Sequence, residues 1–353
     1  MNAILTCLLL LVLGEVVVGF VLTTTSRATT RQNFRRPTRG GLPLSPLLSV
    51  QAADNVTESN SIKTTTSPLP LEQGYLDRFG GIGRLYSNSG TQQQSATLCI
   101  LERLHQATVV VAGIGGVGSW AAEALCRSGV GNIVLIDLDD ICISNTNRQL
   151  HATTSAVGQM KIDVMKQRLL DIHPACNVTL IHDFISPDNV RDMLEGIGPI
   201  TALIDAIDGA TEKSALLGAC TDLAIPVVTC GGAAGRRDMF QIISGDLVNV
   251  EADRLLASCR RILRKEYGFP PGMSASQLRI HKKKMKEWRI SCVYTKEPPP
   301  PKPSAAEEQS SSFRLCDGSL GTACFVTGAY GFAAASLCVD MIAQDKLLPP
   351  RRG

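Results

Sequence analysis

The sequence contains twelve cysteines but no Cys-x-x-Cys pair. Closely spaced cysteine pairs are the local signature of structural zinc sites, so their absence excludes a zinc site of that type. Cys126, Cys142, Cys220 and Cys338 lie in apolar segments, where a free cysteine behaves as a small hydrophobic residue. We therefore expect most of the cysteines to lie in the core.

Acidic residues are absent from residues 23–50, which hold five arginines and many serines and threonines. The preceding residues 4–22 are almost entirely apolar. This combination is typical of a targeting segment, here residues 1–50, followed by a flexible linker at 51–71 that is rich in Ser, Thr and Pro. The favoured interpretation is a bipartite signal and plastid transit peptide. The alternative is a mitochondrial address or a membrane anchor, for example in the mitochondrial outer membrane, because 19 residues just cross a bilayer.

The net charge of +3 comes from this N-terminal segment. Residues 1–50 carry five basic residues and one acidic residue, so the remaining chain has a formal charge of −1. The overall basic balance therefore says nothing about the partners of the folded part.

A glycine-rich turn follows the first strongly apolar run, in the sequence VVVAGIGGVG at residues 109–118. Glycines allow positive φ and let backbone N–H groups approach a phosphate at the start of a helix. The glycines in question are Gly113, Gly115, Gly116 and Gly118. Asp137 follows the next apolar run, 19 residues after Gly118, where a carboxylate would bind a ribose. The glycine spacing also fits a dinucleotide, so this part of the sequence leaves ATP and a nicotinamide cofactor open.

Apolar strands alternate with helices along the chain, which predicts an α/β fold with a doubly wound, mostly parallel, Rossmann-like sheet. The predicted strands are 108–112, 133–136, 178–182, 202–205 and 226–229. After Gly232 the regularity fades, and we expect a C-terminal, substrate-facing extension of the same sheet. The apolar residues 325–343 are predicted to form a buried closing helix rather than a membrane span. Residues 297–312 are predicted to form an exposed Pro- and Ser-rich loop, and residues 347–353 a tail.

Several further motifs, in this order and spacing, resemble the ubiquitin-activating-enzyme-like (ThiF/MoeB) adenylating family. They are RFGGIGRLY (78–86), GIGGVGSWAAEALCRSGVG (113–131), LIDLDD (135–140), NTNRQLHA (145–152), Lys161, DAIDG (205–209) and VVTCGGAAG (227–235). The resemblance covers residues 78–342 and implies a single ATP-binding adenylating domain at residues 72–346. Within this family, the sequence most resembles the dehydratases that act on threonylcarbamoyladenosine in tRNA.

The resemblance implies catalytic roles for Arg148, Lys161, Asp208 and Arg84. Fixed cations stabilise the charge that develops when a carboxylate attacks the α-phosphate of ATP, and Arg148 and Lys161 are expected to supply them. Asp208 is expected to bind Mg²⁺. Asp139 and Asn145 are expected to shape the ribose site and its loop, with ordinary turn chemistry as the equal alternative.

Arg84 precedes the nucleotide-binding motif, and in this family such an arginine reaches the ATP site of the partner in a homodimer. Arg78 is the second candidate for that role, and a surface arginine is the alternative. Cys292 lies in a segment similar to one in the dehydratases, and an active-site or a structural role is open.

The implied function is ATP-dependent cyclisation of N6-threonylcarbamoyladenosine beside the tRNA anticodon, through an acyl-adenylate. Residues 254–289 hold eleven Lys or Arg against two Glu and are expected to contact RNA, with solvated helix faces as the alternative. Their principal basic residues are Arg260, Arg261, Arg264, Lys265, Lys282, Lys283, Lys284 and Lys286. Activation of a ubiquitin-like sulfur carrier is the first rival function, and NAD(P)-dependent oxidation the distant one. A cysteine desulfurase or other sulfur-transfer partner is left open.

Overall fold

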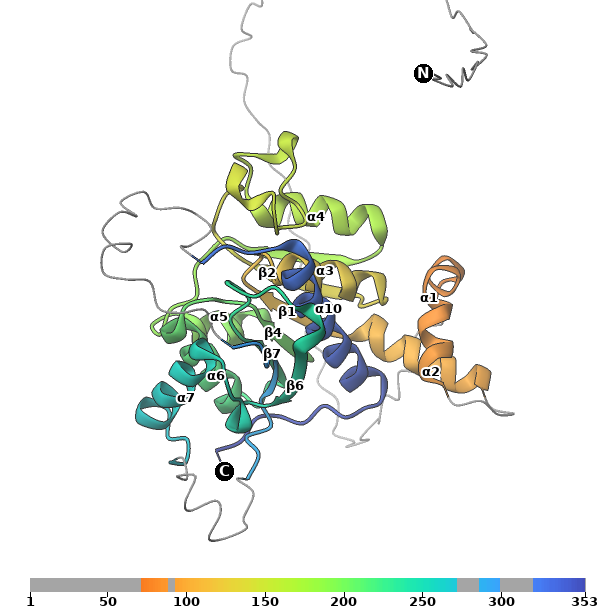
Figure 1. The fold of residues 1–353 in the computed structure, drawn as a ribbon. Helices are drawn as coiled ribbons and strands as arrows, with labels where there is room; N and C mark the ends of the chain where they lie inside the picture. Colours follow the sequence, from red (N-terminus) through yellow and green to blue (C-terminus); the bar gives the residue numbers. More distant parts are fainter. Residues whose placement is uncertain (1–70, 88–92, 272–285, 299–319, 353) are drawn as a thin grey trace, which may run out of the picture. The chain divides into compact units, whose positions relative to one another are not determined.

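A seven-stranded sheet lies at the centre of the part of the chain that the structure, a computed structural model, describes (Figure 1). The described residues are 71–87, 93–271, 286–298 and 320–352. The predicted targeting segment, nearly all of the linker, most of the 297–312 loop and Lys282, Lys283 and Lys284 lie outside them.

The strand order is β3-β2-β1-β4-β5-β7-β6, and all neighbours are parallel except β7 and β6. This confirms the predicted doubly wound sheet. The strands are β1 (Thr108–Ala112), β2 (Asn132–Ile136), β3 (Asn177–Ile181), β4 (Ala202–Asp205), β5 (Val227–Cys230), β6 (Ile242–Asp246) and β7 (Ser291–Thr295). The first five differ from the predicted strands by one residue at most, and β6 and β7 were not predicted.

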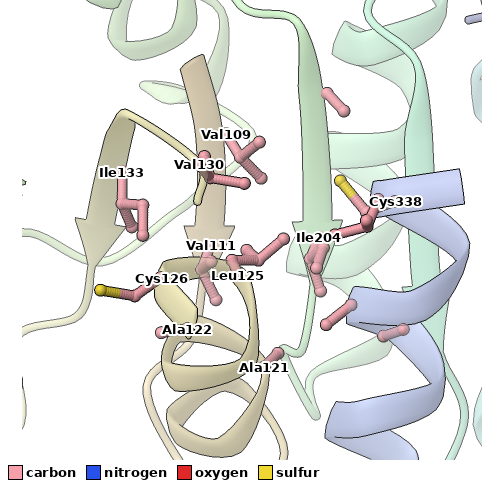
Figure 2. Close-up of a cluster of buried hydrophobic side chains, with 14 of the residues drawn as sticks. Val109, Val111, Ala121, Ala122, Leu125, Cys126, Val130, Ile133, Ile204 and Cys338 are labelled. Atoms are coloured by element: carbon pink, nitrogen blue, oxygen red, sulfur yellow. The ribbon is translucent and has the colours of Figure 1, made fainter. Parts of the chain in front are cut away.

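Helices cover both faces of the sheet because the central strands are apolar on both sides. One face packs against α2 (Gln93–Gln106), α3 (Gly118–Arg127), α4 (Lys161–Ile172) and α10 (Cys324–Ala343). The other packs against α5 (Val190–Ile197), α6 (Ala210–Asp222) and α7 (Arg254–Glu266). In Figure 2, α3 presents Leu125 to Val111 of β1, with Cys338 of α10 and Ile204 of β4 beside them.

α10 is a core helix. By length and composition it could cross a membrane, but it packs on α3 and on the sheet, with its side chains from Val326 to Ala343 largely buried. Tyr330, in the centre of the helix, is fully buried. This packing agrees with the expectation of a buried closing helix.

α1 (Gln73–Tyr86) packs on α2 at the side of the sheet. The Tyr75 hydroxyl donates a hydrogen bond to the Gly129 carbonyl oxygen at 2.6 Å, beyond the end of α3. Phe79, one turn further along α1, is buried as well. Two buried aromatic side chains thus attach α1 to the turn that precedes β2.

Candidate active site

A cleft of about 490 Å³ opens beyond the carboxyl ends of β1, β2, β3 and β4. β1 and β4 are neighbours at the point where the strand order reverses, which is where doubly wound sheets bind ligands. The volume lies in the range of small-molecule sites. The cleft is lined by Gly113, Gly115, Ile136, Asp137, Asp139, Lys161, Asp183, Phe184, Ile185, Ser186, Ala206, Ile207, Asp208, Gly209 and Glu212.

The glycine-rich turn forms one wall, and its glycines are required by close contacts. Gly113 has a φ of +85°, which side chains rarely adopt. A Cβ on Gly118 would lie 1.8 Å from the Gly113 carbonyl oxygen. α3 begins at Gly118 without a side-chain cap, so its N-terminal N–H groups are available to an anion. The turn has the form of a phosphate cradle.

Asp137 is nearly buried at the end of β2, and its carboxylate holds the glycine turn. Oδ2 accepts a hydrogen bond from the Ile114 N–H at 2.6 Å, and Oδ1 accepts one from the Asp139 N–H at 2.9 Å. Burial raises the pKa of Asp137, while Lys161 and the two N–H groups oppose that rise. The predicted ribose ligand therefore also positions the loop around it.

Lys161 opens α4 and is paired with Asp139. Its Nζ lies 2.6 Å from Asp139 Oδ2, and its side chain is only 7% exposed. The Lys161 N–H also donates to the Asp139 carbonyl oxygen at 3.1 Å. The Asp139 carboxylate thus holds the Lys161 ammonium group at the wall of the cleft, and both residues line the cleft.

Asp208 lies exposed in the cleft, on the loop between β4 and α6. Glu212, in the first turn of α6, lines the same wall. Carboxylate oxygens are suitable ligands for Mg²⁺ when phosphate oxygens and water complete its shell. The donor set fits the predicted metal role of Asp208. Among the residues that the structure describes, five carboxylates and one ammonium group line the cleft.

A fully buried ion pair anchors the loop that carries Asp208. Lys213 Nζ lies 2.7 Å from Asp205 Oδ2, and both side chains are 0% exposed. Thr229 Oγ1 donates to Asp205 Oδ2 at 2.6 Å, and Asp205 Oδ1 accepts from the Ile207 N–H at 3.1 Å. Burial alone would lower the pKa of Lys213, but the Asp205 carboxylate outweighs it and the pKa is raised.

Arg148 and Asn145 lie beside the glycine turn and do not line the cleft. The Arg148 guanidinium donates to the Ser144 carbonyl oxygen at 2.9 Å and to Asn147 Oδ1 at 3.1 Å. Its aliphatic part lies against Gly116, where a Cβ would be 3.3 Å from Arg148 Cγ. Asn145 Oδ1 accepts from the Cys142 N–H at 3.0 Å, so this side chain is used in the turn.

Arg84 lies apart from the cleft of its own chain. It is on α1 and lines a separate groove between α1 and α2, together with Leu76, Thr97 and Leu98. Arg78, the second candidate, donates a hydrogen bond to the Ile172 carbonyl oxygen at 3.3 Å.

Cys292 is fully buried in β7 and does not line the cleft. Burial raises the pKa of its thiol well above the ordinary value, which is the environment of an unreactive core cysteine.

Four residues of interest were missed from the sequence. Asp183 and Phe184 follow β3 at its carboxyl end, and an exposed aromatic residue at that position was an available signal. Glu212 had no signal beyond its place in a first helical turn. His151 is buried near Lys161. Its pKa is lowered to about 4, mainly by burial and secondly by the positive charge of Lys161.

The comparisons with known proteins agree with this geometry. The model of the ThiF family matches residues 88–345. The chain is 40% identical to the tRNA threonylcarbamoyladenosine dehydratase of Haemophilus influenzae over 272 residues, which are 77% of this chain and 95% of that protein. It is 37% identical to the enzyme of the same name from Escherichia coli, over 75% of this chain and 93% of the relative.

Solved structures give the same result. The crystal structure of the E. coli tRNA N6-threonylcarbamoyladenosine dehydratase matches with a TM-score of 0.64 and 34% identity, over 79% of this chain and 99% of that chain. The same enzyme in complex with ATP matches with a TM-score of 0.63 and 35% identity, over 78% of this chain and 97% of that one. The chain therefore belongs to the ThiF family and, within it, to the tRNA threonylcarbamoyladenosine dehydratases.

Proposed function

We propose that the chain converts N6-threonylcarbamoyladenosine in tRNA to its cyclic form, with ATP as co-substrate, Mg²⁺ as the metal ion and an acyl-adenylate as the intermediate. The observation that carries this proposal is the cleft itself. It brings the glycine turn, Asp137, Lys161 and Asp208 together at one sheet edge, in a chain that is similar to enzymes with this activity.

Different residues of the chain bind the ribose and the phosphates of ATP. Asp137 accepts hydrogen bonds from the ribose, and the N–H groups of the glycine turn and of α3 face the phosphates. The Lys161 ammonium group binds the same phosphates after it breaks its ion pair with Asp139. Both residues lie on the same wall of the cleft. Arg148 reaches them by releasing the Ser144 carbonyl oxygen. Both cations stabilise charge on the transferred group.

Asp208 holds Mg²⁺ in this proposal, with Glu212 as a neighbouring carboxylate. The ion, when bound, neutralises charge on the phosphate oxygens. Asp208→Asn is therefore expected to shift the Mg²⁺ dependence of the rate to higher concentration. Asp192→Asn, at an exposed position on α5, is the matched control. An unchanged Mg²⁺ titration would remove Asp208 from this role.

The chemistry consists of two substitutions. The threonyl carboxylate attacks the α-phosphorus, a new P–O bond forms, and pyrophosphate leaves. The carbamoyl nitrogen of the same base then attacks the activated carbonyl carbon, loses its proton and expels AMP. Because the second nucleophile belongs to the substrate, the chain supplies orientation rather than a catalytic thiol or imidazole. The buried, protonated state of Cys292 is compatible with this scheme.

Exchange of labelled pyrophosphate into ATP separates this function from its rivals. We expect exchange with tRNA that carries threonylcarbamoyladenosine, and mass spectrometry should show the nucleoside losing one water. Lys161→Ala is expected to abolish both signals, whereas Lys166→Ala on the same helix should keep them. Exchange with a ubiquitin-like carrier protein alone would favour the first rival. A nicotinamide-dependent reaction without exchange would favour the second.

The RNA surface that we propose includes the exposed residues of α7 and Lys286. Arg254, Arg261, Lys265 and Lys286 are exposed. Arg260 is engaged instead: its guanidinium donates to the Val250 carbonyl oxygen at 2.6 Å and to that of Leu247 at 3.2 Å. Arg264 donates to the Pro270 carbonyl oxygen and lies over the Trp288 ring. The exposed residues of this set, of which Lys265 makes a surface contact with Glu266, can contact phosphates, and their replacement should weaken tRNA binding in a salt-dependent way.

We also propose a homodimer in which Arg84 completes the partner's site. The position of Arg84 in a groove apart from its own cleft supports this, because an arginine with a role in ATP chemistry would then have to act in another subunit. The organelle address, membrane contact through residues 4–22 and a sulfur-transfer partner remain proposals that rest on the sequence. A fluorescent fusion to residues 1–50 tests the address, and a diffuse cytosolic signal would contradict it.

A further inference from the structure

Three side chains with strong affinity for soft metal ions meet under α1, away from the nucleotide cleft. They are Cys126 near the end of α3, His173 directly after α4, and Cys176 just before β3. All three are buried, and their ligand atoms lie within 4.8 Å of one another. None of them lines the cleft.

The imidazole of His173 has the Cys126 thiol as a polar neighbour. The His173 side chain is 1% exposed, and within the described ranges neither ring nitrogen has an oxygen or nitrogen partner. A buried imidazole without a strong hydrogen-bond partner is destabilising, so a group that accepts its lone pair would stabilise the site. Something that accepts a nitrogen lone pair fits the observation.

Each of the two thiols contacts a different backbone carbonyl oxygen. Cys126 Sγ lies 3.4 Å from the Leu169 carbonyl oxygen, and Cys176 Sγ lies 3.5 Å from that of Val130. An S–H group is a weak donor, so these contacts are readily given up. The carbonyl oxygens also supply candidates for a further ligand.

We propose that Cys126, His173 and Cys176 bind a structural Zn²⁺ ion. Zinc binds thiolate sulfur at about 2.3 Å and imidazole nitrogen at about 2.0–2.1 Å, so tetrahedral ligand atoms lie roughly 3.5–3.8 Å apart. Since the ligand atoms lie within 4.8 Å of one another, binding requires a contraction of about 1.3 Å at most. Two thiols lose their protons to solvent, and the zinc, two thiolates and one neutral imidazole form a group without net charge. Such a group can be buried without the cost of an isolated charge.

The aromatic residues of α1 give the site a structural consequence. The Phe79 ring lies edge-on to His173 with centroids 4.8 Å apart, and the Tyr75 ring lies 5.7 Å from it. An ion that fixed the His173 ring would fix the surface on which α1 rests. It would also join α3, α4 and β3, whose ends supply the ligands.

Zinc content of the purified full chain tests the proposal. The chain is expressed in zinc-supplemented medium, washed free of loose metal, and unfolded in guanidinium with a zinc-sensitive dye. We expect close to one zinc ion per chain, and a large loss in Cys126→Ser and Cys176→Ser. Cys220→Ser, at an equally buried position in the other core cluster, is the matched control and should keep the ion.

A second measurement does not depend on the folding of variants. Co²⁺ added alone to the metal-free wild-type chain under reducing conditions should give the intense absorption of a thiolate–cobalt site, and Zn²⁺ should abolish it. Wild-type chain with no zinc and no cobalt absorption would overturn the proposal. So would a Cys126–Cys176 disulfide found by peptide mapping of the zinc-supplemented chain under non-reducing conditions, because that bond uses both sulfurs.

Discussion

The buried pair Asp205–Lys213 gives the sharpest stability prediction. Lys213→Met removes the ammonium group that lies 2.7 Å from the Asp205 carboxylate, whose side chain is 0% exposed, and leaves that carboxylate with Thr229 and the Ile207 N–H. Breaking a buried pair from one side costs about 3–5 kcal/mol, whereas replacing both partners is often neutral. We therefore expect Lys213→Met to be strongly destabilising and Asp205→Asn combined with Lys213→Met to recover much of the loss. Asn keeps an oxygen that accepts from Thr229.

Thermal and urea unfolding of the full chain and its variants measure the effect. Lys213→Met should lower Tm by roughly 6–20 °C, at roughly 2–4 °C per kcal/mol. The coupling between the two substitutions should reach roughly 2–3 kcal/mol. Lys265→Met is the matched control, because that side chain is 79% exposed and its contact with Glu266 is worth less than about 1 kcal/mol. Equal effects of Lys213→Met and Lys265→Met, or a double variant less stable than both single variants, would refute the reasoning.

Three further predictions concern the site. The folded-state pKa of His151 is about 4 against 6.5 when unperturbed, so the unfolded chain takes up the proton first and stability is lost as pH falls from 6.5 to 4. His151→Gln should remove up to roughly 3 kcal/mol of that acid dependence in urea titrations, and an unchanged pH profile would contradict it. Gly118→Ala places a Cβ 1.8 Å from a carbonyl oxygen and should abolish ATP binding by calorimetry, whereas Gly115→Ala, with no neighbour closer than 3.9 Å, should lose less. Arg84→Ala and Arg148→Ala chains, each inactive, should regain activity when mixed if Arg84 acts in trans, because one site of each mixed dimer is then intact; continued inactivity after verified subunit exchange would assign Arg84 to its own subunit.

Local patterns predicted the first five strands because each is a short apolar run whose ends coincide with polar or glycine residues. β6 and β7 escaped prediction for a physical reason. β6 reads IISGD and lies at the sheet edge, where one side of the strand needs no apolar partner. β7 lies after Gly232, where the regular alternation of apolar strands and helices that identified the first five strands fades.

The site shows the same division. Gly113 and Asp137 were predicted from their places after strands and Asp208 from the family resemblance, and parallel strands bring all three to one edge. The Lys161–Asp139 contact and the engagement of Arg148 with the Ser144 carbonyl oxygen depend on side-chain rotamers, which no spacing encodes. The spacing of the cysteines likewise excluded only zinc sites built from residues close together in the sequence. Cys126 is brought to His173 by the packing of α3 on α4, 47 residues apart in the sequence.

The acidic lining of the cleft bears on the form in which nucleotide enters it. Five carboxylates against one ammonium give the walls a formal charge of −4, and ATP without a cation would bring several more negative charges to the same walls. Partly enclosed charges of like sign repel strongly, because water screens them less than it does at an open surface. The cleft should thus discriminate against the bare nucleotide and accept ATP as its complex with a divalent cation. Its affinity for ATP would then follow the supply of that cation, and the protein would respond to the metal status of its compartment as well as to its ATP.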